Sequence, residues 1–508
     1  MTEFSAAFDA YIHKTGAAQQ QAAVQIAALP NAVEQLQAKL KGDDRRAALS
    51  LLSRCAKRLP QKRAIAQWPI DTLCALLRDA DAKTRKNAAI LVGALEQRAY
   101  VPALIDAHCQ EQQQFVRPSQ ILALGALGGA EATAYLRACQ LPEGDDLHVL
   151  AQRDALQKAL SRLCPQQSRP FTGFRTTHTV WLMPVSGLLL QLLDEGEDKG
   201  IPLVQGTGKW AQVTTDDYLS LFRLRTFYEA LLPLAAGVPV TPEAFAAVLQ
   251  KTHAYALLDE MHGGSGTFPL RLELRGSDLD RGAFARAFFA ALPGAQFTNA
   301  PSSYDVELRA FVKENHATLS LRLHSAHDPR FDYRLSTVPA SIHPAAAAAI
   351  LYAHRAYMQK QHTVLDPCCG AGTLMVERAK LMGARALTGT DISPSAWRIA
   401  RGNCHAAGLH AKVYNRDARG FHSDYGVDEI LCNLPFGHRV GNHESNEALY
   451  DTLLAQWPAL LKPNGFVLAI TNEKALFKKL AQKHGWRLVR QTPFSSGGLS
   501  PSAFLLMR

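Results

Sequence analysis

The last third of the chain alternates short apolar runs with longer amphipathic ones, and this alternation constrains the fold more than any other feature. The apolar runs are TVLDPCC (363–369), ALTGTDI (386–392), AKVYNRDA (411–418), EILCNLPFG (429–437) and GFVLAITN (465–472). Strands that alternate with helices form a parallel sheet covered by helices on both faces. The pattern therefore predicts a Rossmann-like, doubly wound α/β domain over residues 337–508.

In such a sheet a ligand binds outside the carboxyl ends of the strands, so the residues that follow each strand are the candidates. Asp366 ends the first strand, and the turn after it contains Gly370 and Gly372, where glycine permits a sharp turn and close approach of a ligand. The third glycine of a dinucleotide motif and the GK[ST] of a P-loop are absent. Such a loop suits a ligand with a carboxylate and an ammonium group, and S-adenosylmethionine is that ligand.

The next two strands also end in acids. Asp391 follows the second strand, and its two carboxylate oxygens could accept hydrogen bonds from both ribose hydroxyls. Asp417 follows the third strand and could accept a hydrogen bond from the adenine amine. Ordered signals at consecutive strand ends predict a methyltransferase fold. The other predicted cofactor contacts are Pro367, Thr373, Ile392, Ala418 and Asn433.

The fourth strand ends in NLPFG (433–437), which predicts the catalytic residues. An amine on a base is a poor nucleophile because its lone pair is delocalised into the ring. The side-chain carbonyl of Asn433, with a backbone carbonyl of Leu434 or Pro435, could accept both amine hydrogens and favour the pyramidal transition state. Pro435 fixes the turn, and Phe436 could stack on the base. Asn433, Pro435 and Phe436 are therefore the predicted catalytic residues.

The N-terminal part, residues 1–164, has helical periodicity from residue 21 onward. Residues 84–97 and 116–129 resemble each other, with Arg85 and Arg117 32 positions apart, which favours HEAT-like helical repeats that pack only against their neighbours. An irregular helical bundle is the alternative. The repeats could bind a protein partner. Small residues in both copies would let the helices approach closely: Gly93, Ala94, Gly125 and Ala126.

Residues 165–336 mix strand-like and helical patterns, which predicts an α+β module. We expect an amphipathic helix over 216–235, a strand over 267–276, a helix over 278–292 and two strands over 304–325. The formal net charge of +10 favours a polyanionic partner such as RNA. The candidate phosphate contacts in this module are Arg223, Arg225, Arg271 and Arg275.

Composition excludes several other classes. There is no apolar run of about 18 residues and the N-terminus is not a signal peptide, so no membrane association is expected. The nine cysteines are scattered without a CxxC pair, which favours reduced thiols and a cytoplasmic location. The 18 histidines include no HxxxH or HExxH motif, so no metal site is expected.

Residues 267–508 resemble the THUMP-associated tRNA guanine-N2 methyltransferases, which belong with the Asn-Pro-Pro-Tyr-type amino methyltransferases. The resemblance rests on DPCCGAGTLMVE, on NLPFG and on the lead-in FDYRLSTVPASIHPAAAAAIL. It implies S-adenosylmethionine-dependent methylation of a guanine amine in the tRNA acceptor stem, often at position 6, and a middle module that is THUMP-like and binds RNA. It also implies RNA contacts by Arg334 and Arg439. The helical N-terminus lies outside the usual architecture of this family.

Other readings of the same motifs stay open. The substrate could be guanine in ribosomal RNA, adenine in DNA or a protein glutamine, because loops of this type serve several amines and amides. An inactive RNA-binding scaffold is a further alternative. The Asn, Pro and Phe of NLPFG argue against it, because a scaffold has no physical need for an amide and a ring at this strand end.

Overall fold

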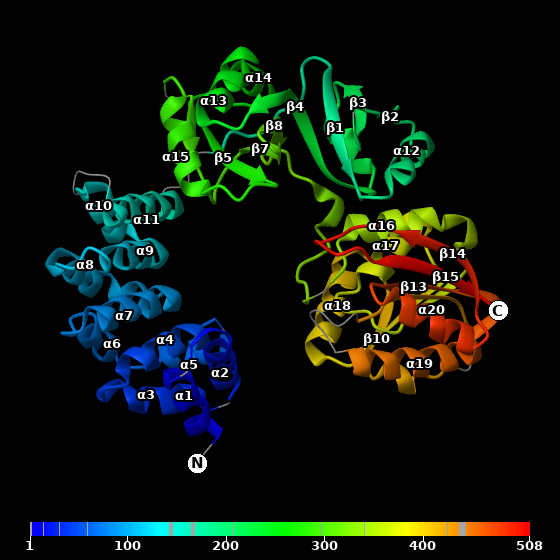
Figure 1. Ribbon diagram of the computed structural model, residues 1–508, viewed down its shortest axis with the longest axis horizontal. Helices are drawn as coiled ribbons and strands as arrows, with labels where there is room; N and C mark the ends of the chain where they lie inside the picture. The colour runs from blue at the N-terminus through cyan, green and yellow to red at the C-terminus, as the bar shows by residue number, and fades with distance from the viewer. Residues whose placement is uncertain are drawn as a thin grey trace. The chain divides into compact units, whose positions relative to one another are not determined.

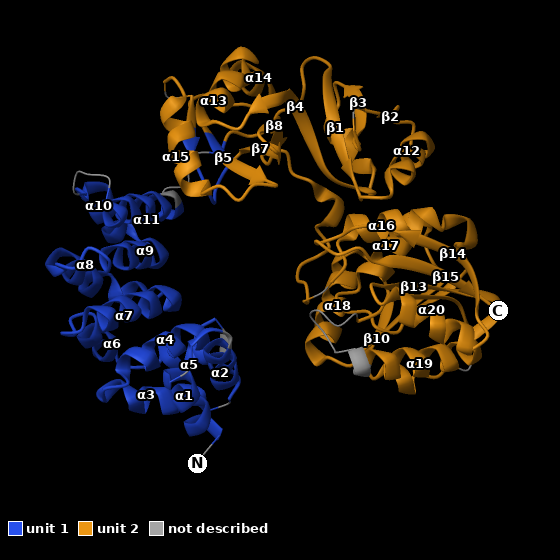
Figure 2. Cartoon of the chain, in the orientation of Figure 1, with its two compact units in different colours: residues 1–168, 269–271, 298–304 blue, residues 169–268, 272–297, 305–508 orange. Residues whose placement is uncertain are grey.

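The computed structural model describes residues 3–13, 15–29, 31–57, 59–141, 146–163, 168–206, 208–294, 296–339, 341–423, 425–435 and 443–508. The chain divides into two compact units (Figure 2), one of residues 1–168, 269–271 and 298–304, and one of residues 169–268, 272–297 and 305–508. Most of the middle region thus shares a unit with the C-terminal region. Within the described ranges, no helix combines the length and the apolar character that a membrane span requires.

The first unit is built from successive short helices. Helices α4, α7, α9 and α11 contact one another in that order, which is the neighbour-to-neighbour packing expected of helical repeats (Figure 1). The helices of this unit are α1 (Glu3–His13), α2 (Gly16–Ala28), α3 (Ala32–Ala38), α4 (Arg45–Cys55), α5 (Leu59–Ala66), α6 (Ile70–Leu76), α7 (Ala82–Leu95), α8 (Val101–Gln110), α9 (Arg117–Leu127), α10 (Ala130–Ala138) and α11 (Leu147–Leu163).

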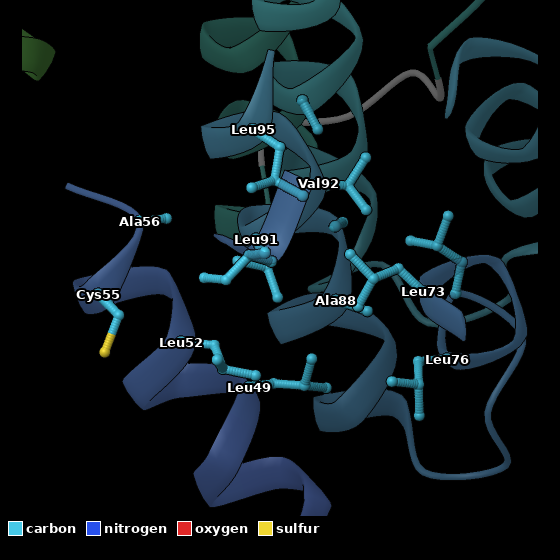
Figure 3. Packing of buried hydrophobic residues seen from close by; sticks show 14 of the residues in the cluster. Leu49, Leu52, Cys55, Ala56, Leu73, Leu76, Ala88, Leu91, Val92 and Leu95 are labelled. Carbon is cyan, nitrogen blue, oxygen red and sulfur yellow. The ribbon is translucent and has the colours of Figure 1, made fainter. Parts of the chain in front are cut away.

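Glycines set how closely these helices approach. A Cβ on Gly125 of α9 would lie only 2.6 Å from the Cα of Ala159 in α11. Between α4 and α7, leucine and alanine side chains of both helices fill the space (Figure 3). An ion pair repeats along the stack, since Arg45 donates to Asp79 and Arg85 to Glu111, each at 2.8 Å. The predicted small-residue packing is confirmed, since Gly93 and Gly125 both face alanines of the next helix closely.

The middle region holds an eight-stranded sheet in the order β2-β3-β1-β4-β8-β7-β5-β6. This agrees with the predicted α+β module. Its strands are β1 (His178–Pro184), β2 (Val204–Gln205), β3 (Ala211–Thr215), β4 (Phe227–Pro239), β5 (Phe268–Arg275), β6 (Phe297–Asn299), β7 (Val306–Lys313) and β8 (His316–Leu323), and its helices are α12 (Leu189–Asp198), α13 (Pro242–Lys251), α14 (Ala254–Met261) and α15 (Arg281–Ala291).

The helix predicted over residues 216–235 is wrong. A short 3₁₀ turn, η3 (Leu219–Arg223), is followed by the long central strand β4, which pairs with both β1 and β8. Three consecutive residues of this strand, Ala230, Leu231 and Leu232, are buried. A strand buried on both faces lacks the alternation of an exposed strand, so its apolar spacing was mistaken for that of a helix.

The C-terminal region forms a seven-stranded sheet in the order β11-β10-β9-β12-β13-β15-β14. Its strands pair in parallel from β11 to β13, and β15 runs antiparallel to both β13 and β14. The predicted Rossmann-like order of strands and helices is confirmed. The elements are β9 (Thr363–Asp366), β10 (Ala386–Asp391), β11 (Ala411–Asn415), β12 (Val427–Asn433), β13 (Leu461–Thr471), β14 (Arg487–Pro493) and β15 (Ser502–Met507), with α16 (Pro344–Ala353), α17 (Thr373–Met382), α18 (Pro394–Ala406), α19 (His443–Leu460) and α20 (Lys474–Lys483).

Candidate cofactor and substrate site

The strand ends singled out by the sequence meet at one end of the C-terminal sheet. Strands β11, β10, β9 and β12 are neighbours and run in parallel. In the register of these strands Asp366 lies opposite Gly389, two residues before Asp391. Asn433 ends β12 on the other side of β9. The structure therefore places the glycine loop, Asp391 and Asn433 along one row of carboxyl ends.

Backbone hydrogen bonds hold the glycine loop between β9 and α17. The amide of Cys369 donates to the carbonyl of Thr390 at 2.9 Å, and the amide of Gly372 donates to the carbonyl of Cys369 at 2.7 Å. Gly370 and Gly372 have φ angles of 53° and 78°, a conformation that L side chains rarely adopt. Thr373 opens α17, and its buried hydroxyl has no hydrogen-bond partner within the described residues.

The carboxylate of Asp391 joins this loop to the second strand. It accepts hydrogen bonds from the amides of Gly370 and Ser393, each at 2.9 Å and on different oxygens. Each oxygen has a second lone pair, so both could still accept a hydroxyl. The next side chain, Ile392, is 67% exposed and offers an apolar surface beside them. Diol acceptors, an apolar surface and an unpartnered threonine hydroxyl fit the ribose and adenine of a nucleoside such as S-adenosylmethionine.

Asn415 was missed by sequence reasoning. Its side-chain amide donates to the backbone carbonyls of Asp391 and Ile392 at 2.9 and 3.0 Å, so it ties β11 to the loop after β10. The available signal was its position, because a polar residue that ends β11 directly precedes the predicted Asp417 loop.

Asp366 lies beneath the loop and is almost completely buried. Burial, with a smaller contribution from nearby Asp391, raises the pKa of its carboxyl to about 8, although the amide of Cys368 donates to it at 3.2 Å. A buried acid of this kind supports the loop from below. A direct contact between Asp366 and a cofactor therefore stays a prediction.

Asp417 has a partner of its own. The guanidinium of Arg419 lies 2.6 Å from the Asp417 carboxylate, and this hydrogen bond lowers the pKa of the carboxyl. Ala418, which follows it, is buried at the start of the turn η6 (Ala418–Gly420). Arg419 already donates to both carboxylate oxygens of Asp417. A hydrogen bond from adenine would therefore either be added to these bonds or replace one of them.

A tyrosine fixes the turn that follows Asn433. The amide of Leu434 donates to the carbonyl of Ile470 at 3.0 Å. The buried hydroxyl of Tyr450 in α19 donates to the carbonyl of Pro435 at 2.5 Å and also contacts the hydroxyl of Thr471 at 2.8 Å. Because the Pro435 carbonyl has this partner, Leu434 is the better candidate for the second acceptor of the amine. Phe436 and Arg439 lie outside the described residues.

The predicted RNA-binding arginines differ in their surroundings. Arg225 donates to both carboxylate oxygens of Glu377 in α17 at 2.8 and 2.9 Å, and the hydroxyl of Tyr333 donates to the same carboxylate at 2.7 Å. Arg225 therefore joins the start of β4 to the C-terminal region. Arg223 is exposed and donates to the backbone carbonyl of Lys199 at 2.7 Å.

Two further arginines lie on β5. Arg271 packs 5.4 Å from the centre of the Tyr304 ring. Arg275 lies 3.6 Å from the carboxylate of Glu229 and is 41% exposed, so it could still contact a phosphate. Arg334 lies in the segment that leads from β8 to α16.

Comparison with known proteins assigns the region that contains this site. Residues 332–501 match the family model of the RMKL-like methyltransferase domain. A second model, that of HEAT repeats, matches residues 70–157. The methyltransferase region and the helical repeats predicted from the sequence are both confirmed.

Named relatives cover only part of the chain. A tRNA (guanine(6)-N2)-methyltransferase of Thermus thermophilus is 31% identical over 204 residues, which are 40% of this chain and 60% of that protein. The tRNA (guanine(6)-N(2))-methyltransferase THUMP3 of Bos taurus is 27% identical over 169 residues, 30% of this chain and 33% of that protein. The chain thus spans less than two thirds of the length of either relative.

A solved structure shares the fold. A putative methyltransferase complexed with SAH superimposes with a TM-score of 0.50 at 15% identity, covering 65% of this chain and 98% of that one. At this identity the match supports the fold alone. It agrees with the class I order of the C-terminal sheet.

Proposed function

We propose that the protein is an S-adenosylmethionine-dependent RNA methyltransferase that forms N2-methylguanosine in tRNA. One observation carries the proposal: Asn433 ends β12 in the same row of strand ends as the glycine loop and Asp391. The methyltransferase domain match and the relatives named for guanine-N2 methylation of tRNA support the choice of reaction and substrate. The acceptor stem, and position 6 within it, are the corresponding proposals for the nucleotide.

The residues that would hold the cofactor follow from the geometry. Asp391 would accept the ribose hydroxyls, Ile392 would cover the adenine, and the loop of Gly370 and Gly372 would approach the amino acid part through its backbone. Thr373 would offer its unpartnered hydroxyl. When bound, S-adenosylmethionine supplies an electrophilic methyl group on a sulfonium.

Asn433 and Leu434 would orient the attacking amine. The side-chain carbonyl of Asn433 and the backbone carbonyl of Leu434 would accept the two amine hydrogens, and this arrangement stabilises a pyramidal nitrogen better than a planar one. Neither group is a base at neutral pH, so the proton would leave to water after transfer. Pro435 and Tyr450 would keep the two carbonyls in place, since the Tyr450 hydroxyl holds the turn.

The remaining parts of the chain would serve substrate binding. The α+β module, through exposed arginines such as Arg223 and Arg275, and the helical repeats would contact RNA phosphates, and the repeats also offer a surface for a protein partner. A cytoplasmic location suits the described cysteines, which are all free thiols.

The first experiment measures methyl transfer by the purified full chain to unmodified tRNA, ribosomal RNA and duplex DNA. Nucleoside mass spectrometry of the product identifies the modified base. We expect N2-methylguanosine in tRNA. Transfer to ribosomal RNA alone would identify ribosomal RNA as the substrate in place of tRNA. If no nucleic acid is methylated, a protein substrate or an inactive scaffold is the remaining explanation.

The second experiment tests Asn433. The Asn433→Ala variant should lose about 100-fold in single-turnover rate, because one preorganised acceptor is removed, while cofactor and tRNA affinities stay near those of the wild type. Asn433→Asp keeps an acceptor and should retain substantial activity if the role is geometric. Asn87→Ala, in α7 of the helical unit, is the matched control. A wild-type rate in Asn433→Ala would show that NLPFG is only a turn.

A further inference from the structure

A pocket of about 380 Å³ lies beside the proposed site. Its lining comes from β4, from the segment before α16, and from the hairpin between β14 and β15: Tyr228, Arg334, Ser341, His343, Ser495, Ser496, Gly497 and Gly498. None of the proposed cofactor or catalytic residues that the structure describes is among these lining residues.

Both walls of the pocket connect to the proposed site. The hairpin joins Pro493 to Ser502, and Ser502 pairs with Thr471, whose hydroxyl contacts Tyr450. The opposite wall runs past the glycine loop, where a Cβ on Gly370 would lie 3.6 Å from the side chain of Val338. The pocket therefore opens at the same end of the sheet as Asn433.

The polar groups of the pocket are mainly hydrogen-bond donors. Arg334 donates to the Thr337 hydroxyl at 2.8 Å, and its Nε has no hydrogen-bond partner within the described part of the chain. A guanidinium keeps its charge at any physiological pH. The hydroxyl of Ser341 accepts from the amide of Val338 at 3.3 Å, which leaves its own hydrogen to donate. No carboxylate is among the described residues that line the pocket.

His343 also presents a hydrogen-bond donor to the pocket. Its Nδ1 accepts a hydrogen bond from the amide of Ala345 at 3.1 Å, so in the neutral ring the hydrogen lies on Nε2. Burial, with nearby Arg334 and Arg330, lowers the pKa of His343 to about 4, so the ring is neutral at pH 7. The ring of Tyr228 packs edge-on against it, with the ring centres 4.8 Å apart.

We propose that this pocket binds a phosphodiester of the RNA substrate, next to the nucleotide whose base reaches Asn433. The inference rests on the proposed function. One fixed cation and several donors, with no acid among the lining residues that the structure describes, match the phosphate and its non-bridging oxygens. Because β4 and the C-terminal hairpin both line it, the bound phosphate would set the register of the RNA relative to the catalytic residues.

A second anion could compete for the same groups, namely the carboxylate of S-adenosylmethionine. The pocket volume favours the phosphodiester with its attached sugars, since a carboxylate would leave most of the about 380 Å³ empty. The two sources are separated by measuring cofactor and RNA affinity independently on the same variants.

The test uses the full chain with unmodified tRNA and, separately, with S-adenosylmethionine alone. Arg334→Gln should weaken tRNA binding roughly tenfold, while cofactor affinity stays unchanged. The slope of log Kd against log salt concentration should become smaller by about 1, the value expected for the loss of one phosphate contact. Arg487→Gln, an exposed arginine at the opposite end of β14, should change neither.

A second pair of variants does not depend on Arg334. Ser341→Asp places a carboxylate in the pocket and should weaken tRNA binding more than the uncharged Ser341→Asn. Equal tRNA affinity in that pair, together with an unchanged salt dependence in Arg334→Gln, would overturn the inference. Loss of cofactor affinity would assign the pocket to the cofactor carboxylate and also overturn it. If the wild-type chain methylates tRNA, the proposed function holds even when these variants overturn the phosphodiester pocket. If the wild-type chain neither binds nor methylates RNA, both the proposed function and the pocket assignment are wrong.

Discussion

The hydroxyl of Tyr450 donates a hydrogen bond of 2.5 Å to the backbone carbonyl of Pro435, two residues after Asn433. Tyr450 is completely buried, and the same hydroxyl contacts Thr471 at the end of β13. A side chain of α19 therefore fixes the turn on which the proposed acceptors lie. Since a small displacement of reacting groups can cost a large factor in rate, this contact should matter for the chemistry.

Replacing Tyr450 with Phe should lower the single-turnover rate by about tenfold, which corresponds to about 1.4 kcal/mol of lost positioning. Cofactor affinity should stay unchanged, because the Tyr450 hydroxyl bonds to Pro435 and Thr471 and to none of the residues proposed to hold the cofactor. The control is Tyr255→Phe, which removes another hydroxyl that donates to a backbone carbonyl, that of Gly266. Equal rates in the two variants would mean that the Pro435 turn keeps its geometry without Tyr450.

The two acids after β10 and β11 should differ in their effect on cofactor binding. Asp391→Ala removes the acceptors for the ribose hydroxyls and two bonds that hold the loop, so affinity should fall by about 1–3 kcal/mol. Asp417→Ala should cost less, because Arg419 already satisfies this carboxylate. Calorimetry with S-adenosylmethionine measures both. A larger loss in Asp417→Ala would show that adenine is recognised there and that the Arg419 pair opens.

The strand ends of the site could be predicted because their signals are local. Asp366, Asp391 and Asn433 each end a short apolar run, and a parallel sheet brings such ends together whatever the rest of the chain does. The residues that hold them could not be found in this way. Tyr450 meets Pro435 from a different helix, and Asn415 was visible only as a polar strand end.

The error in the middle region has the same origin. The segment 216–235 has apolar residues at helical spacing, and only its pairing with β1 and β8 makes a strand of Phe227–Pro239. The sequence predicts Arg225, two residues before this strand, as a candidate phosphate contact. Its partner Glu377 lies 152 positions away in the sequence, so no local pattern predicts the ion pair between them.

Arg225 and Glu377 should be essential to the stability of the second unit. Glu377 is buried and accepts from Arg225 and Tyr333, so Arg225→Ala leaves a buried carboxylate without its cation and should cost about 3–5 kcal/mol of unfolding free energy. The double variant Arg225→Ala/Glu377→Gln should be less destabilised, because the amide still accepts from Tyr333 and carries no charge.

Denaturant unfolding of the full chain measures these differences. Arg275→Ala serves as the control, since Arg275 is 41% exposed and its pair with Glu229 should contribute less than about 1 kcal/mol. If Arg225→Ala is no less stable than Arg275→Ala, the ion pair between Arg225 and Glu377 does not contribute to the stability of the second unit. A fragment that begins after Val338 would lack both Arg225 and Tyr333, so we expect it to be less stable than the same region in the full chain.

The buried carboxyl of Asp366 should make stability depend on pH. Its pKa in the folded protein is raised to about 8 by burial, whereas an unfolded Asp has a pKa of about 3.9. Between these values the folded state keeps a proton that the unfolded state has lost. The free energy of unfolding therefore decreases as pH rises through this window, by up to about 1.4 kcal/mol per pH unit from this group alone.

Asp366→Asn should remove this contribution, because an amide accepts the Cys368 hydrogen bond and does not titrate. The difference in thermal midpoint between Asp366→Asn and the wild type should thus increase from pH 5 to pH 8 in favour of the variant. Asp428→Asn is the control: hydrogen bonds from Lys462 and Thr363 outweigh the effect of burial and lower the pKa of Asp428 to about 2, so this carboxyl is ionised in both states throughout that range and its midpoint difference should stay constant. Parallel midpoint curves for Asp366→Asn and the wild type would mean that Asp366 is ionised in the folded protein.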